Sequence, residues 1–149
     1  MVENPLRPDA TGADLAVSLR VFLVENHEDT RTLLCMLLES LGHRVLAAET
    51  MKEALRTLPL FDCDVLISDI GLPDGDGWEL MQRLRLKHPI YAVAISGFGM
   101  STDCARSRSV GYRHHLVKPY GIEQLPAILR EAANECARTA APRPTSRER

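Results

Sequence analysis

The sequence predicts an α/β fold in which one mostly parallel sheet has helices packed on both faces. Three observations predict it. Strand-like and helix-like segments alternate five times along the chain, as parallel sheets with helical crossovers require. Several strand-like segments are unbroken apolar runs, which are typical of strands buried on both faces. The 149 residues are 45% hydrophobic, enough to bury one core without disulfides or a structural metal.

Five short segments are predicted to form the strands of the sheet: 20–24, 44–48, 64–68, 90–95 and 114–117. The first, third and fourth are the apolar runs, so they are expected to be buried on both sides.

Five segments with helical spacing of apolar residues follow these strands: 30–41, 51–58, 77–87, 101–109 and 122–137. In the first helix an apolar stripe is formed by Leu34, Leu37, Leu38 and Leu41, and Gly42 is the expected stop. In the last helix, Pro126 lacks a backbone donor and would loosen the first turn unless the helix begins late.

The two ends of the chain differ in composition from the predicted domain at 20–137. Residues 1–19 lack a sustained period and are predicted to form a flexible leader. Residues 138–149 hold four arginines and one glutamate and are predicted to form a disordered basic tail. The tail's charge of +3 leaves −5 for the rest of a chain whose net charge is −2. The domain therefore lacks the basic footprint of a nucleic-acid-binding protein.

The cysteines are too widely spaced for a zinc site or a disulfide-rich scaffold: Cys35, Cys63, Cys104 and Cys136. No apolar run has the roughly 18 residues of a membrane span, and the first residues do not have the pattern of a signal peptide. We expect reduced thiols, no membrane insertion and a cytoplasmic location.

Chemically active side chains follow four of the predicted strands: Glu25 and Asn26, then Asp69, Ser96 and Lys118. Ligands of parallel α/β sheets bind beyond the carboxyl ends of the strands, so these side chains are expected to converge. Carboxylate and amide oxygens suit Mg²⁺, while a lysine and a hydroxyl suit phosphoryl oxygens. An aspartate beside a metal can attack phosphorus and form an acyl phosphate.

Four motifs at these positions occur in a characteristic order: Val-Glu-Asn-His-Glu-Asp at 24–29, Asp-Ile-Gly-Leu-Pro-Asp-Gly-Asp-Gly at 69–77, Ile-Ser-Gly at 95–97 and Val-Lys-Pro-Tyr at 117–120. Together they resemble the signature of the receiver domain of two-component response regulators. The resemblance covers about residues 20–137. It implies a flavodoxin-like, doubly wound sheet with strand order 2-1-3-4-5.

The resemblance implies that Asp69 accepts a phosphoryl group from a histidine of a sensor kinase or phosphotransfer protein. It also implies that Mg²⁺ is held by Glu25, Asn26, Asp69 and the backbone carbonyl of Gly71. Relatives usually carry two acids where this chain has Glu25 and Asn26. An amide offers an oxygen but no charge, so we expect weaker Mg²⁺ binding than in a relative with two acids.

The remaining site residues are implied to bind and report the phosphoryl group. Lys118 would bind it, and the hydroxyl of Ser96 would turn toward its oxygens. Rotation of His115 would then change the surface that a protein partner contacts. Asp74 and Asp76 are instead expected to shape the turn before the third helix.

The sequence predicts a phosphorylated receiver that controls a downstream protein, with no direct nucleic-acid contact, and it leaves open whether the chain forms a homodimer. Two alternatives remain. If Asn26 abolishes metal binding, the domain is a phosphorylation-independent pseudo-receiver that serves as an interaction module. A small aspartyl-phosphate enzyme is disfavoured because a haloacid-dehalogenase-type phosphatase needs an acid where this chain has Gly71.

Overall fold

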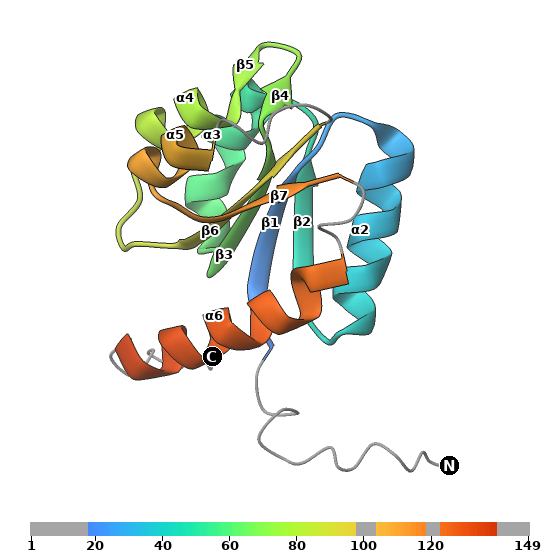
Figure 1. The fold of residues 1–149 in the computed structure, drawn as a ribbon, viewed down its shortest axis with the longest axis vertical. Coiled ribbons are helices and arrows are strands. Elements are labelled where there is room, and N and C mark those ends of the chain that lie inside the picture. Colours follow the sequence, from blue (N-terminus) through green and yellow to red (C-terminus); the bar gives the residue numbers. More distant parts are fainter. Residues whose placement is uncertain (1–17, 98–103, 119–122, 140–149) are drawn as a thin grey trace.

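The computed structural model describes residues 18–97, 104–118 and 123–139 (Figure 1). Most of the leader predicted for 1–19 and of the tail predicted for 138–149 lies outside these residues. The central sheet consists of parallel strands β1 (Arg20–Val24), β2 (Arg44–Ala48), β3 (Val65–Asp69), β6 (Tyr91–Ser96) and β7 (Tyr112–Val117). They lie in the order β2-β1-β3-β6-β7. Counting only these strands, this is the predicted order 2-1-3-4-5, which is confirmed.

Helices cover both faces of the sheet: α2 (Glu28–Ser40), α3 (Met51–Phe61), α4 (Gly77–Arg83), α5 (Cys104–Val110) and α6 (Leu125–Thr139). Figure 1 shows α2 and α6 on one face, with α3, α4 and α5 on the other. A short antiparallel hairpin, β4 (Gly71–Leu72) and β5 (Gly75–Asp76), lies between β3 and α4. The sequence pattern did not predict this hairpin.

Two apolar layers hold the helices against the sheet. On one face, Leu34 and Leu38 of α2 and Leu129 of α6 pack against the strand side chains that point toward these two helices. On the other face, Leu58 of α3 and Leu80 of α4 pack against the opposite side chains of the same strands. Strands β3 and β6 are buried along their whole length, and β1 nearly so. The apolar runs therefore correctly predicted which strands are buried on both sides.

Helix α3 is longer than predicted, because it continues through Pro59 to Phe61. Proline costs a helix one backbone hydrogen bond and so disfavours this continuation. Tertiary packing opposes this effect, since the ring of Phe61 packs edge-on against Phe22 with centroids 6.0 Å apart. The helix ends at Asp62, which adopts the left-handed conformation with φ of 56°.

Helix α4 is shorter than predicted, ending at Arg83 rather than at Lys87. Leu84 is already extended, with ψ of 139°. Leu84 and Leu86 both pack partly buried against the core on this face. Alternate residues of an extended chain point to the same side, so leaving the helix brings both leucines to the core.

The other helices also differ from the prediction at their ends. Helix α2 begins at Glu28 and ends before Leu41, which is 39% exposed and does not complete the predicted stripe. Gly42 follows with φ of 97°, a conformation that favours glycine. Helix α6 begins late, at Leu125, so Pro126 lies in its first turn, where the missing donor costs little.

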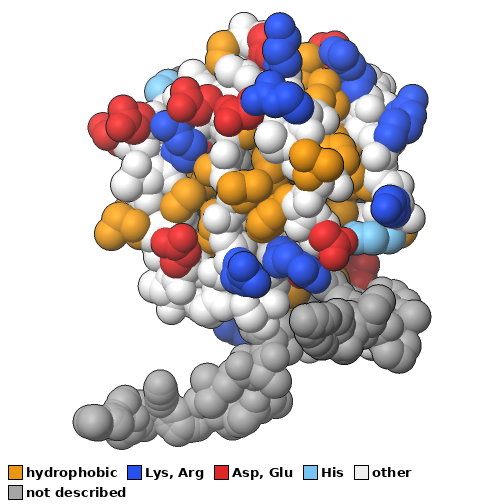
Figure 2. All heavy atoms as spheres, turned by 180° about the vertical axis from the view of Figure 1, so that it is seen from behind, with side chains coloured by type: hydrophobic (Ala, Val, Ile, Leu, Met, Phe, Trp, Pro, Cys, Tyr) orange, Lys and Arg blue, Asp and Glu red, His pale blue; other side chains and the backbone are white. Residues whose placement is uncertain are grey.

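The side opposite the view of Figure 1 has apolar side chains in its middle, with positive and negative side chains around them (Figure 2). This mixture agrees with a net charge of only −2. None of the helices in the described ranges combines the length and the apolar character that a membrane span requires.

Candidate functional site

Three charged side chains meet at the carboxyl edge of the sheet. Glu25 follows β1, Asp69 ends β3 and Lys118 follows β7. The Nζ of Lys118 donates to Glu25 Oε1 at 2.9 Å and to Asp69 Oδ2 at 3.1 Å. Glu25 is 1% exposed and Asp69 is 5% exposed, so both carboxylates are almost removed from water. The sequence predicted that these residues would converge, and the structure brings them together.

Burial and neighbouring charge act differently on the three groups. Burial raises the pKa of Asp69, the charge of Glu25 raises it further, and Lys118 opposes both. Burial also acts to raise the pKa of Glu25, but hydrogen bonds from Lys118 and His27 outweigh it and lower that pKa. For Lys118, the two carboxylates outweigh burial and raise its pKa. The ammonium therefore stays charged, and Asp69 ionises less readily than an isolated aspartate.

The backbone after β3 fits closely around Asp69. The N–H of Gly71 donates to Asp69 Oδ1 at 3.2 Å. A Cβ at Gly77 would lie 2.9 Å from the carbonyl oxygen of Asp69 and 3.1 Å from the hydroxyl of Tyr112. That hydroxyl donates to the carbonyl of Gly77 at 2.8 Å. Only glycine fits at this close approach of the loop to the strand end.

The two aspartates of the following turn have structural roles. Asp76 caps α4 because its Oδ1 accepts from the N–H of Glu79 at 2.7 Å. The carboxylate of Asp74 accepts from the N–H groups of Met51 and Lys52, each at 2.8 Å. Asp74 therefore joins the hairpin to the start of α3. The interpretation of both aspartates as residues that shape the turn is consistent with these contacts.

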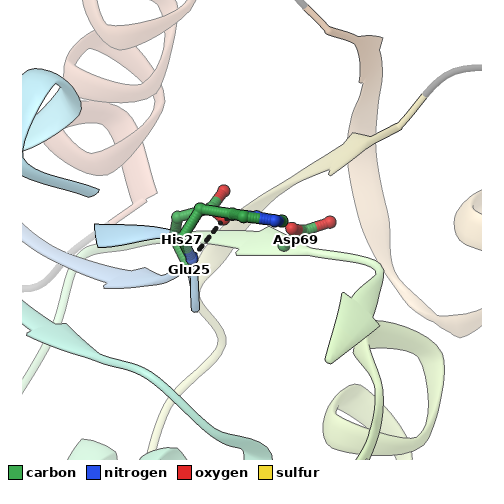
Figure 3. Close-up of side chains that lie close together, drawn as sticks. All are labelled: Glu25, His27 and Asp69. Carbon is green, nitrogen blue, oxygen red and sulfur yellow. Dashed lines mark hydrogen bonds and ion pairs between the residues drawn. The ribbon is translucent and has the colours of Figure 1, made fainter. Parts of the chain in front are cut away.

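A donor set for a divalent cation lies beside Asp69. Ligand atoms of Glu25, His27 and Asp69 all lie within 4.8 Å of one another (Figure 3). His27 Nδ1 is 3.2 Å from Glu25 Oε2, which also accepts from the backbone N–H of His27 at 3.0 Å. Asn26 lies half-buried in the same loop between β1 and α2. Two carboxylates against one ammonium leave negative charge for a cation, so the residues fit one.

The position of His27 was missed, because the sequence suggested only that it begins or caps the first helix. It does occupy the N-cap position of α2, without a side-chain capping bond. Its imidazole instead contacts Glu25, two residues earlier. A histidine two residues after a site carboxylate is a signal that could have suggested a ligand.

Ser96 and His115 form a second pair of the predicted site residues. Ser96 ends β6 and is fully buried, and its Oγ lies 2.9 Å from His115 Nε2. The carbonyl of Ser96 accepts from the backbone N–H of Lys118 at 2.9 Å. In the register between β3 and β6, Asp69 lies opposite Ile95, the neighbour of Ser96. The second pair thus adjoins the three charged side chains Glu25, Asp69 and Lys118, which we call the charged cluster.

Comparison with known proteins identifies the family. Residues 21–130 match the model of the response regulator receiver domain. The chain belongs to this family. Receiver domains act in two-component signalling, where they accept phosphoryl groups from histidine kinases and generally bind Mg²⁺.

Curated relatives of this receiver domain include both regulators and sensor proteins. It is 36% identical over 124 residues to the KDP operon transcriptional regulatory protein KdpE of Escherichia coli, covering 83% of this chain and 55% of the relative. It is 37% identical over 145 residues to the virulence sensor protein BvgS of Bordetella bronchiseptica, covering 92% of this chain and 12% of the relative. The chain therefore spans about half of the first relative and a small part of the second.

Solved structures show the same fold. A CheY-like receiver domain protein from Methanospirillum hungatei superposes with a TM-score of 0.76 at 22% identity, covering 83% of this receiver and 100% of that chain. A receiver domain from Clostridium thermocellum gives 0.74 at 21% identity, covering 82% and 99%. These likenesses, together with the sheet order, confirm the predicted fold class.

Proposed function

We propose that Asp69 of this receiver accepts a phosphoryl group from the phosphohistidine of a sensor kinase or a phosphotransfer protein. The observation that carries the proposal is the buried carboxylate of Asp69 held 3.1 Å from the ammonium of Lys118 at the carboxyl edge of the sheet. A buried carboxylate that serves only packing would not need a second carboxylate beside it, since the two repel each other.

The transfer balances as a displacement at phosphorus. An oxygen of Asp69 forms the new bond to phosphorus as the bond between phosphorus and the histidine nitrogen breaks, and the electron pair returns to the leaving imidazole. Lys118 already points its donors at this carboxylate, so it would hold a phosphoryl oxygen there. Later attack of water on phosphorus would return Asp69 and release inorganic phosphate.

We propose Mg²⁺ as the cation, held by Glu25, Asn26, Asp69 and the carbonyl of Gly71. A bound divalent cation supplies positive charge that offsets the phosphoryl oxygens and the acidic side chains. His27 adds a nitrogen donor, which suits transition-metal ions better than Mg²⁺. Because Asn26 contributes no charge, Asn26→Asp is expected to tighten Mg²⁺ binding in a calorimetric titration, and an unchanged affinity would reject this role of Asn26.

The test of phosphorylation uses acetyl phosphate as the donor. The protein is incubated with acetyl phosphate and Mg²⁺, and intact mass is measured over time. We expect a single phosphoryl adduct in the wild type and in Asp29→Ala, a control in the first turn of α2. We expect none in Asp69→Ala. An adduct that persists in Asp69→Ala contradicts the assignment of the phosphoacceptor.

One observation favours a second candidate, the phosphorylation-independent pseudo-receiver. Asn26 stands where relatives usually carry an acid, so loss of useful metal binding would leave the fold as an interaction module. The same experiment separates the candidates, because a wild type that forms no adduct supports the pseudo-receiver. In either case we propose a protein as the downstream partner.

A further inference from the structure

A continuous chain of hydrogen bonds runs from Ser96 away from the charged cluster. His115 Nε2 lies 2.9 Å from Ser96 Oγ, and His115 Nδ1 lies 2.7 Å from Ser107 Oγ. Trp78 Nε1 then donates to Ser107 Oγ at 2.9 Å. We call these residues the relay: Ser96 of β6, His115 of β7, Ser107 of α5 and Trp78 of α4.

Three members of the relay are inaccessible to water. Ser96, Ser107 and Trp78 are all buried, and His115 is half-buried. Buried polar atoms that lose a partner are costly, so these contacts strongly restrict one another. The sequence suggested that Trp78 is a packing residue, and its indole does lie in the core. Ser107 gave no signal in the sequence.

Donor chemistry fixes the direction of one contact of the relay, and the tautomer of His115 sets the direction of the other two. An indole N–H can only donate, so Ser107 Oγ accepts from Trp78. In the tautomer of the neutral imidazole that carries its hydrogen on Nε2, the hydroxyl hydrogen of Ser107 donates to Nδ1 of His115. Nε2–H donates to Ser96 Oγ. The hydroxyl hydrogen of Ser96 is thereby left for an acceptor other than His115.

We propose that Ser107 is a positioning residue that fixes the tautomer of His115, and that the relay carries movement of the Ser96 hydroxyl to Trp78. The proposal rests on the proposed function and on the movement that the family resemblance implies for Ser96, whose hydroxyl would turn toward phosphoryl oxygens at Asp69. When Ser96 turns toward them, His115 Nε2–H loses its acceptor and the ring must move. Its bond to Ser107, and with it the partner of Trp78, then changes.

The surroundings of the relay allow this movement and connect it to the surface. A cavity of about 60 Å³ borders both Ser107 and His115, which leaves space beside the ring. At the other end of the relay, the guanidinium of Arg106 lies 4.0 Å from the centre of the Trp78 ring. Arg106 is exposed on α5. Movement of the indole would therefore alter an exposed cation at the contact between α4 and α5.

Trp78 is the single tryptophan of the chain, so tryptophan fluorescence reports this site alone. Emission is recorded before and after treatment with acetyl phosphate and Mg²⁺, and intact mass gives the phosphorylated fraction. In the wild type we expect the emission to change in proportion to the adduct. In Ser107→Ala we expect the adduct to form while the phosphorylation-dependent change falls at least about fivefold.

The matched control is Ser109→Ala on the same helix. Ser109 is exposed and its hydroxyl donates to the carbonyl of Arg106, outside the relay. This variant should keep the wild-type fluorescence change. Far-ultraviolet circular dichroism establishes that both variants are folded. If Ser107→Ala shows the same change per adduct as Ser109→Ala, the relay is rejected.

The tautomer of His115 is tested without phosphorylation, by nitrogen-15 NMR of the histidine rings. We expect the wild type to carry the hydrogen on Nε2 and Ser107→Ala to lose this preference. A ring hydrogen on Nδ1 in the wild type overturns the proposal. If the wild type forms no adduct, the proposed function fails while the NMR result still decides whether Ser107 positions His115.

Discussion

The charged cluster and the relay adjoin at the carboxyl edge of the sheet, but the first consists of charged side chains and the second of neutral hydrogen-bonded groups. Glu25, Asp69 and Lys118 are charged and come from residues at the ends of three strands. The relay is a row of neutral hydrogen bonds that runs from the sheet into two helices. The first arrangement holds charge at one point, and the second links groups across the domain.

The difference teaches which properties each task requires. A phosphoryl group is bound by fixed charges, and the electrostatic interactions of these charges are strong only where water is excluded. A positional signal needs groups that exchange one hydrogen-bond partner for another, because such an exchange between neutral groups costs little while the loss of a partner is costly. Loss of a member should therefore cost more stability in the charged cluster than in the relay.

The largest effect is expected for Lys118→Met, which leaves Glu25 and Asp69 buried beside each other. Removing one partner of a fully buried ion pair lowers the free energy of unfolding by about 3–5 kcal/mol. About 2–3 kcal/mol is expected for this lysine, because its side chain is 21% exposed. Urea denaturation measures the change in the free energy of unfolding. Lys52→Met, on the exposed start of α3, is the control. Equal losses in both variants would show that Lys118 does not hold the carboxylates.

A somewhat smaller effect is expected for Gly77→Ala, which forces the loop away from the carbonyl of Asp69. The new Cβ would meet backbone at 2.9 Å, and overpacking of this kind costs about 1–3 kcal/mol. Gly71→Ala is the matched control, since a Cβ at Gly71 would have nothing within 4 Å. Thermal unfolding of both variants measures the difference. If both lose the same stability, the close approach at Gly77 does not constrain Asp69.

His27→Ala tests whether the charged cluster has a nitrogen ligand. We expect Ni²⁺ binding to weaken by about tenfold, with Mg²⁺ binding nearly unchanged, because imidazole suits transition metals and Mg²⁺ prefers oxygen. Isothermal titration calorimetry with each ion measures both affinities. His88→Ala is the control, as His88 lies before β6, at the opposite edge of the sheet. Equal weakening for both ions would mean that His27 acts only through Glu25.

The smallest effect is expected for Ser96→Ala, which removes one neutral hydroxyl from the relay. His115 Nε2 then loses an acceptor, and the loss of such a hydrogen bond costs about 1 kcal/mol. Urea denaturation against Ser40→Ala, whose hydroxyl is exposed, measures it. A loss as large as that of Lys118→Met would remove the contrast between the two regions.

Much of the architecture was predictable because its signals are local. Apolar runs indicated the strands that are buried on both sides, and the alternation of segments indicated the parallel sheet. The ends of helices were less predictable, since α3 continues through Pro59 to bring Phe61 onto Phe22 and α4 stops early to bury Leu84. In both places, contacts with distant residues outweigh the local preference.

By itself the sequence determined the fold class, the family and the position of Asp69 and Lys118 at strand ends, because strand period and short motifs are properties of neighbouring residues. Only the tertiary structure decided that His27 faces Asp69 and that Ser107 joins His115 to Trp78. These contacts depend on how a loop and two short helices rest on the sheet. Residues far apart in the chain come into contact there, and no local sequence pattern predicts such contacts.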